Sequence, residues 1–124
     1  MSEALRGVVV CHNRLAAALV EAAEGITGVK GALLPVSNTD CDRGSLETRI
    51  LEAVDSRPTV VFVDLASGSC LIATLARLRG RPDVKVVTGV NLPMLVDFVF
   101  NLEQTPDGAA ERAVGAAFRA IKVP

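Results

Sequence analysis

The chain has 124 residues, of which 50% are hydrophobic, and a formal net charge of −1. This size and apolar content suit one compact domain, which we expect to span residues 1–124. Lys and Arg are dispersed, Trp and Tyr are absent, and no apolar run nears the roughly 18 residues of a membrane span, which argues against nucleic-acid binding and direct membrane insertion.

Short apolar runs along the chain predict four strands. They are rich in Val and Leu and do not alternate strictly between apolar and polar residues, as is typical of strands covered on both faces. In chain order, the predicted strands are residues 7–11, 32–36, 59–63 and 84–90.

Segments with helical periodicity follow the strands, and each is expected to bury one apolar stripe against the sheet. Gly25 and Gly28 close the first helix, Ser45 and Glu47 open the second, and Ser69 can cap the third. A fourth helix, buried, is predicted over residues 93–100, and a fifth begins after Thr105. The stripes of the first three helices are Leu15, Leu19, Ala22 and Ile26; Leu46, Ile50 and Val54; and Leu71, Ile72, Leu75 and Leu78. The stripe of the fifth helix is Ala110, Ala113, Val114, Ala117, Phe118 and Ile121.

Repeated strand–helix units with right-handed crossovers predict a doubly wound α/β domain, with a mainly parallel four-stranded sheet and helices on both faces. For so few strands the common order is 2-1-3-4, as in flavodoxin-like three-layer sandwiches. In that order the first and third strands are neighbours, and ligands bind outside their carboxyl ends. The alternative order 3-2-1-4 would separate these two strands.

One histidine and one aspartate follow the first and third predicted strands. His12 is the only histidine of the chain, and Asp64 comes directly after residues 59–63. The order 2-1-3-4 places the two side by side. An imidazole can be a nucleophile, and a carboxylate on one ring nitrogen fixes how the other is presented. The alternative is a surface histidine that is satisfied by hydrogen bonds.

The turn Ser67-Gly68-Ser69 comes directly before the third helix. Free backbone N–H groups and hydroxyls at a helix start make a cradle for a phosphate, and a capping role for Ser69 is compatible with it. We therefore hypothesise that His12 attacks a phosphoryl donor with one ring nitrogen, that Asp64 holds the other, and that this turn receives the oxygens. Arg14 adds positive charge there or is simply solvated.

No metal or cofactor is expected. A second histidine is absent, and the three cysteines, Cys11, Cys41 and Cys70, lack a paired CxxC spacing. Cys11 should point to the face opposite His12, into the core, and a packing role is favoured for Cys70. There is no Walker-type loop and no GxGxxG fingerprint. Unpaired thiols, without a charged-then-apolar leader before Gly7, favour a reducing cytoplasm.

Three segments resemble the IIA component of the mannose-type (mannose/fructose/sorbose) sugar phosphotransferase system. They are the strand ending at His12, the stretch Phe-Val-Asp-Leu-Ala-Ser-Gly-Ser at 62–69 and, most distinctively, Thr-Gly-Val-Asn-Leu-Pro-Met-Leu-Val at 88–96, which contains Asn91. The resemblance implies a phosphotransferase whose His12 accepts a phosphoryl group from the carrier protein HPr and passes it to a IIB component. It also implies that Asp64 orients His12 and that Ser69 lies in the following turn.

The resemblance has further implications. Membrane IIC and IID components would be reached only through IIB, and a homodimer is expected, using the edge near residues 91–100. Three positions depart from the family pattern: Asn13 replaces a glycine after the histidine, and in the turn after Asp64 Ser67 replaces a glycine and Cys70 a proline. Asn tolerates the left-handed backbone that this turn needs. Two alternatives share this chemistry: a regulatory module that reports its phosphorylation state, and the phosphocarrier of a dihydroxyacetone kinase.

Overall fold

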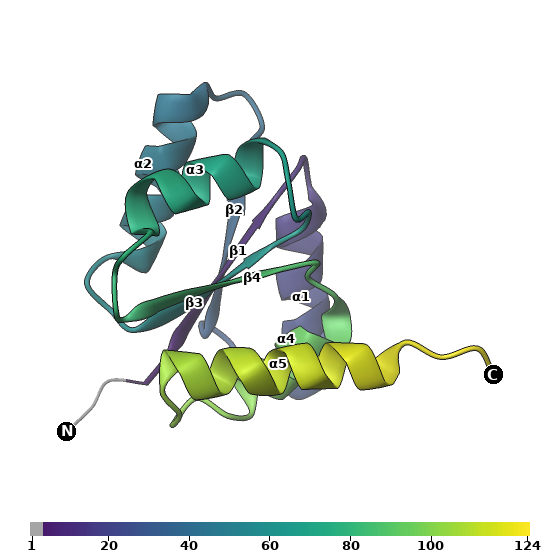
Figure 1. The fold of residues 1–124 in the computed structure, drawn as a ribbon. Coiled ribbons are helices and arrows are strands. Elements are labelled where there is room, and N and C mark those ends of the chain that lie inside the picture. The colour runs from purple at the N-terminus through teal and green to yellow at the C-terminus, as the bar shows by residue number, and fades with distance from the viewer. Residues whose placement is uncertain (1–3) are drawn as a thin grey trace.

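A computed structural model describes residues 4–124, which form three layers, a sheet between two layers of helices (Figure 1). The sheet has four parallel strands in the order β2-β1-β3-β4. The strands are β1 (Arg6–Cys11), β2 (Leu33–Ser37), β3 (Thr59–Val63) and β4 (Val84–Thr88). The predicted doubly wound α/β fold and its strand order are therefore confirmed.

Helices cover both faces of the sheet (Figure 1). On one face lie α2 (Arg43–Val54) and α3 (Ser69–Leu78), and on the other lie α1 (Leu15–Thr27), α4 (Leu92–Val99) and α5 (Pro106–Ala120). Successive residues of a strand point to opposite faces, so Val8 and Val10 pack toward α2 and α3 while Val9 and Cys11 pack toward the other layer. This double coverage explains why the strands read as continuous apolar runs.

The predicted stripe of α2 is confirmed, but that of α1 is wrong by one residue. Leu46, Ile50 and Val54 are all buried. In α1 the buried residues are Ala16, Val20 and Ala23, whereas Leu15 and Ile26 are exposed. The alanines bring the helix axis close to its neighbours, and the larger side chains then lie at the margin or in solvent.

Small residues also dominate the buried sides of α5 and α3, so the predicted stripes are confirmed only in part, at Ala113, Ala117 and Leu78. On α5 the buried residues are Ala109, Ala113 and Ala117, and three larger side chains of the expected stripe remain exposed. These are Val114, Phe118 and Ile121, the last of which follows the helix. On α3, Cys70, Ala73, Thr74 and Leu78 are buried, and Ile72 is exposed.

Several element boundaries differ from the prediction, β1, β2 and α4 by one residue. Asp42, not Ser45, caps α2, because its Oδ1 accepts from the Ser45 N–H at 2.8 Å. Gly68 occupies the N-cap of α3, and Ser69 is the first helical residue. Gly28 ends α1 in the left-handed conformation, as expected, while Gly25 lies inside the helix. β4 ends at Thr88 because the backbone turns, with φ of 74° at Gly89.

The predicted apolar helix over residues 93–100 is α4, with Pro93 in its first turn. Its residues Met94, Leu95, Phe98 and Val99 are buried between α1, α5 and the sheet. None of the helices within residues 4–124 has the length and hydropathy that crossing a bilayer requires.

Candidate functional site

The candidate site lies at the carboxyl ends of β1 and β3, the two central strands. Val10 of β1 is paired with Val63 of β3, so the residues that follow leave the sheet side by side. The Asp64 N–H still donates to the Val10 carbonyl at 3.3 Å, which ties the third strand to the first up to its last residue. The 2-1-3-4 order makes this edge the switch point of the sheet, where such folds bind ligands.

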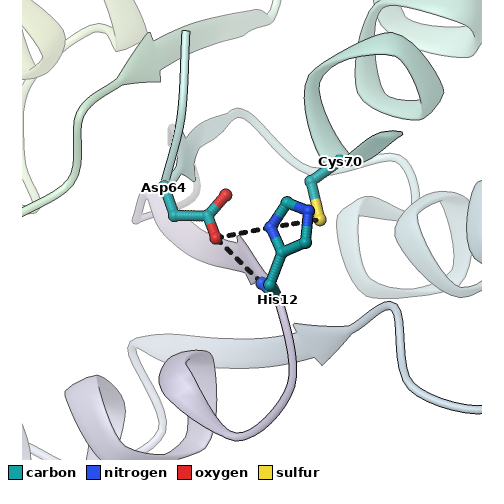
Figure 2. A group of neighbouring side chains, drawn as sticks. All are labelled: His12, Asp64 and Cys70. Carbon is teal, nitrogen blue, oxygen red and sulfur yellow. Dashed lines mark hydrogen bonds and ion pairs between the residues drawn. The ribbon is translucent and has the colours of Figure 1, made fainter. Parts of the chain in front are cut away.

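The side chains of His12 and Asp64 meet there. His12 Nδ1 lies 2.8 Å from Asp64 Oδ2, and the same oxygen accepts the His12 backbone N–H at 2.9 Å (Figure 2). The other oxygen, Oδ1, accepts the Leu65 N–H at 2.9 Å. Three hydrogen bonds therefore fix the carboxylate, and two of them come from the histidine that it orients. The predicted pairing of His12 with Asp64 is present in the structure.

The surroundings of Asp64 keep its carboxylate ionised. Burial alone would raise its pKa, but the hydrogen bonds from the His12 backbone and ring and from Leu65 outweigh it, so the pKa lies below its ordinary value. The Asp64 side chain is 9% exposed and that of His12 is 38% exposed. The carboxylate is thus sheltered, whereas part of the imidazole faces solvent.

This geometry determines which ring nitrogen of His12 is a nucleophile. An ionised carboxylate only accepts hydrogen bonds, so the Nδ1 that it contacts carries the proton and Nε2 keeps its lone pair. Among residues 4–124, no protein group forms a hydrogen bond with Nε2. The pair therefore favours the tautomer that leaves Nε2 free of protein hydrogen bonds.

Cys70 lies next to the histidine–aspartate pair, and its contact with the histidine was not predicted from the sequence. Its Sγ lies 3.7 Å from His12 Nδ1 (Figure 2), and its side chain is fully buried. Burial and the nearby Asp64 charge raise the pKa of the Cys70 thiol to about 11, and burial raises that of Cys11 to about 12. Both thiols are therefore protonated at neutral pH. Cys11 is buried on the other face of the sheet, as predicted.

The turn from Ser67 to Ser69 is exposed beside this pair. Gly68 has φ of 90°, and no side chain caps the first turn of α3. The N–H groups of that first turn have no partner within the helix. Ser69 therefore does not serve as the predicted N-cap, and its hydroxyl and the adjacent N–H groups remain accessible to an anion.

The neighbours of His12 in sequence form a tight turn. Asn13 adopts the left-handed conformation with φ of 53°, as its side chain allows. Its N–H donates to Asn38 Oδ1 at 3.0 Å, and its carbonyl accepts from Ser37 Oγ at 2.6 Å. Arg14 precedes α1 and is exposed. These contacts anchor the His12 turn to the end of β2.

Asn91 belongs to the opposite helix layer. It caps α4, since its Oδ1 accepts from the Met94 N–H at 3.1 Å, and its Nδ2 donates to the Ala117 carbonyl at 3.4 Å. Both ends of the amide are used in joining α4 to α5. The structure thus gives this distinctive residue a structural contact, and its predicted role at the site stays a prediction.

A parallel α/β domain with a histidine–aspartate pair at its switch point belongs to the doubly wound folds, which bind ligands at this edge of the sheet. A family model described as the PTS system fructose IIA component, where PTS is the sugar phosphotransferase system, matches residues 7–114. The chain belongs to this family, which supports a role in phosphoryl transfer within such a system. A search of curated proteins finds no match.

Solved structures of the same fold agree with this assignment. The chain is similar to the phosphotransferase system component EIIA from Streptococcus agalactiae, with a TM-score of 0.87, 18% identity and 96% of each chain covered. It is similar to the mannose/sorbose specific IIA subunit from Enterococcus faecalis, with a TM-score of 0.81, 20% identity, and 98% of this chain and 96% of that one covered. For the IIA protein associated with the fucose utilization operon of Streptococcus pneumoniae, the TM-score is 0.80 and the identity 23%, covering 98% of this chain and 94% of that one.

Proposed function

We propose that the protein is a phosphocarrier in which His12 Nε2 accepts a phosphoryl group from the phosphohistidine of HPr and passes it to a IIB component. The observation that carries this proposal is the 2.8 Å contact between His12 Nδ1 and the Asp64 carboxylate, which leaves the Nε2 lone pair available. Membership of the family supports the same chemistry.

The proposed step conserves atoms and charge. The Nε2 lone pair attacks phosphorus while the P–N bond of the donor phosphohistidine breaks and its electron pair returns to the donor ring. Nδ1 keeps its proton, so positive charge develops on the His12 ring as the new P–N bond forms. The Asp64 carboxylate opposes that charge at 2.8 Å. Transfer to IIB repeats the step with His12 as the leaving group, and no cofactor takes part.

The exposed turn after β3 supplies groups for the phosphoryl oxygens. In the proposal, the uncapped N–H groups at the start of α3 and the hydroxyls of Ser67 and Ser69 donate hydrogen bonds to the phosphoryl oxygens. Gly68, with φ of 90°, gives that turn its shape. Arg14, two residues after His12 and exposed, adds positive charge near the ring.

The test is phosphorylation of the purified chain with phosphoenolpyruvate, enzyme I and HPr, followed by intact mass. We expect one acid-labile phosphate that depends on HPr and is absent from His12→Ala. The matched control is Asn38→Ala, which changes the adjacent turn but leaves the ring. Uptake by His12→Ala, or none by the wild type with active donor proteins, would contradict the proposal. Uptake without transfer to any IIB would favour a regulatory role, and transfer only to a dihydroxyacetone kinase would favour that alternative.

We also infer a homodimer, through a surface other than the one near residues 91–100 that the sequence suggests. Most apolar side chains of α4 are buried within the protein, while α5 exposes Val114 and Phe118. Beside them, between α5 and the edge strand β4, lies a groove of about 550 Å³. The edge strand β4 has free backbone groups, and the exposed apolar side chains of α5 lie next to it, so this surface suits binding of a second copy of the chain. Light scattering should give twice the chain mass, and Phe118→Asp should give the monomer; a wild-type monomer would contradict the inference.

Exchange with HPr and IIB implies a cytoplasmic protein that meets the membrane IIC and IID components only through IIB. The three cysteines are free, which fits a reducing compartment. Fractionation of cells that produce the protein would test this location, and recovery with the periplasmic fraction would contradict it.

A further inference from the structure

Three side chains with different donor atoms meet at the end of β1. His12 Nδ1 lies 2.8 Å from Asp64 Oδ2 and 3.7 Å from Cys70 Sγ, and all three ligand atoms lie within 4.8 Å of one another (Figure 2). The thiol is fully buried and the carboxylate nearly so, while the imidazole is partly exposed. Phosphoryl transfer as proposed uses the first two groups but gives the thiol no part.

Two of the three spacings between these atoms, those from His12 Nδ1, are near the spacings of a tetrahedral zinc site. With Zn–S of about 2.3 Å and Zn–N and Zn–O of about 2.0–2.1 Å, tetrahedral angles place N and S about 3.6 Å apart and N and O about 3.3 Å apart. The observed nitrogen–sulfur distance is 3.7 Å. The nitrogen–oxygen distance of 2.8 Å must open by about 0.5 Å, which a small rotation of either side chain supplies. The donors converge from three separate elements, since they follow β1, follow β3 and begin α3.

We propose that His12, Asp64 and Cys70 bind a zinc ion, with its fourth position open to solvent. A borderline-soft ion suits this combination of imidazole, carboxylate and thiolate, whereas calcium and magnesium prefer oxygen ligands alone. The ion enters on the exposed side of the imidazole. On binding, the thiol proton passes to solvent, so the site contributes two negative ligands to one dication.

Zinc at this position inverts the histidine tautomer. A neutral imidazole that ligates through Nδ1 carries its proton on Nε2, so the Nδ1 proton is lost and one is gained at Nε2. The net change for the three groups is the release of one proton, from the thiol. Nε2 then has no lone pair with which to attack phosphorus, and Asp64 no longer holds the Nδ1 proton. The zinc form is therefore inactive as a phosphoryl acceptor, and by linkage the phosphorylated form binds zinc more weakly. This block on transfer, unlike zinc binding itself, rests on the proposed function.

Cobalt(II) is the probe for the site, because a thiolate ligand gives it a charge-transfer absorption that other ligands do not. We would titrate the full chain with Co²⁺ and then displace it with Zn²⁺. One equivalent with thiolate absorption is expected for the wild type and for the control Cys41→Ala, which removes a partly buried thiol outside the cluster. In Cys70→Ala the absorption should vanish and affinity should fall more than about 100-fold, since even outer partners of ligands are worth about 10–100-fold.

Other outcomes would overturn the proposal. They are the absence of saturable binding, a thiolate band that survives in Cys70→Ala, and a band lost in Cys41→Ala. Thermal unfolding of each variant without metal shows whether it is folded. Because Ala in place of Cys keeps a small apolar side chain at the buried position, we expect both variants to fold.

A second readout measures the effect on transfer. Zinc at one equivalent should stop phosphate uptake by the wild type and by Cys41→Ala, but not by Cys70→Ala, and a chelator should restore it. If zinc inhibits the wild type, Cys41→Ala and Cys70→Ala equally, it acts on the donor proteins or on His12 alone. That result would overturn the proposed inhibition of transfer by the three-ligand zinc site. If the chain takes up no phosphate under any condition, the proposed function fails, while the cobalt titration still decides the metal site.

Discussion

Asp64→Asn tests the role of the carboxylate with almost no change of shape. Each carboxylate oxygen accepts a backbone N–H, Oδ2 from His12 and Oδ1 from Leu65. An amide has only one oxygen, so in either orientation its NH₂ group faces an N–H donor. With the NH₂ toward His12, the ring can pair only as an acceptor at Nδ1, and the proton moves to Nε2. The variant therefore populates a tautomer that cannot attack phosphorus.

The expected loss of rate can be worked from the 2.8 Å separation of Nδ1 and Oδ2. At an effective dielectric constant of about 20, a full positive charge at that distance is stabilised by about 6 kcal/mol. Partial charge in the transition state and solvent at the exposed side of the ring reduce this to about 3 kcal/mol, or about 100-fold in rate.

The assay is single-turnover phosphorylation by phospho-HPr, quenched and followed by intact mass. Asp83→Asn is the matched control, because the Asp83 carboxylate also accepts a side-chain hydrogen bond, from Arg81 at 2.9 Å, but lies just before β4 at the other end of the sheet. The reasoning is refuted if Asp64→Asn transfers within about threefold of the wild type, or if Asp83→Asn slows transfer as much.

Three further predictions concern stability, measured by urea unfolding. Because the folded Asp64 pKa lies below its ordinary value of 3.8, the advantage of the wild type over Asp64→Asn should be present above that pH and be lost as the pH falls through the lowered value; a constant difference down to pH 2 would contradict this. Gly7→Ala should destabilise by about 1–3 kcal/mol, because its Cβ would lie 2.6 Å from Leu33 Cδ2 and 2.8 Å from Phe98 Cε2; an unchanged unfolding midpoint would show that the core yields. Asn13→Val should cost about 1–2 kcal/mol because φ is 53°, with Asn13→Gly as the control that keeps this conformation; equal midpoints for the two variants would contradict the reasoning.

The pairing of His12 with Asp64 could be predicted because it depends on few variables. Both residues directly follow a strand, and the 2-1-3-4 order makes those strands neighbours. Parallel pairing then brings their carboxyl ends to one edge, whatever the details of helix packing. A boundary error of one or two residues, as at the end of β4, does not change that placement.

The rotation of the helices could not be predicted in the same way. In α1, apolar residues occur in adjacent pairs, such as Leu15 with Ala16 and Leu19 with Val20, so two stripes about 100° apart fit the sequence equally well. In the structure, the stripe with the smaller residues packs against the neighbouring elements. Volume complementarity among several elements is not visible in one segment.

The position of Cys70 shows the same limit at the site. Its contact with His12 depends on where α3 begins, and a start one residue later would rotate its side chain by about 100°. Gly68, with φ of 90°, sets that start. The sequence alone contains no paired spacing that would indicate the contact.

Nitrogen-15 and phosphorus-31 NMR of the phosphorylated chain would test the central claim most directly. His12 is the only histidine, so a single imidazole is observed. We predict phosphorus coupled to Nε2 and a proton on Nδ1, held by Asp64. Phosphorus on Nδ1, or on no histidine nitrogen in a chain that has gained phosphate, would contradict the account.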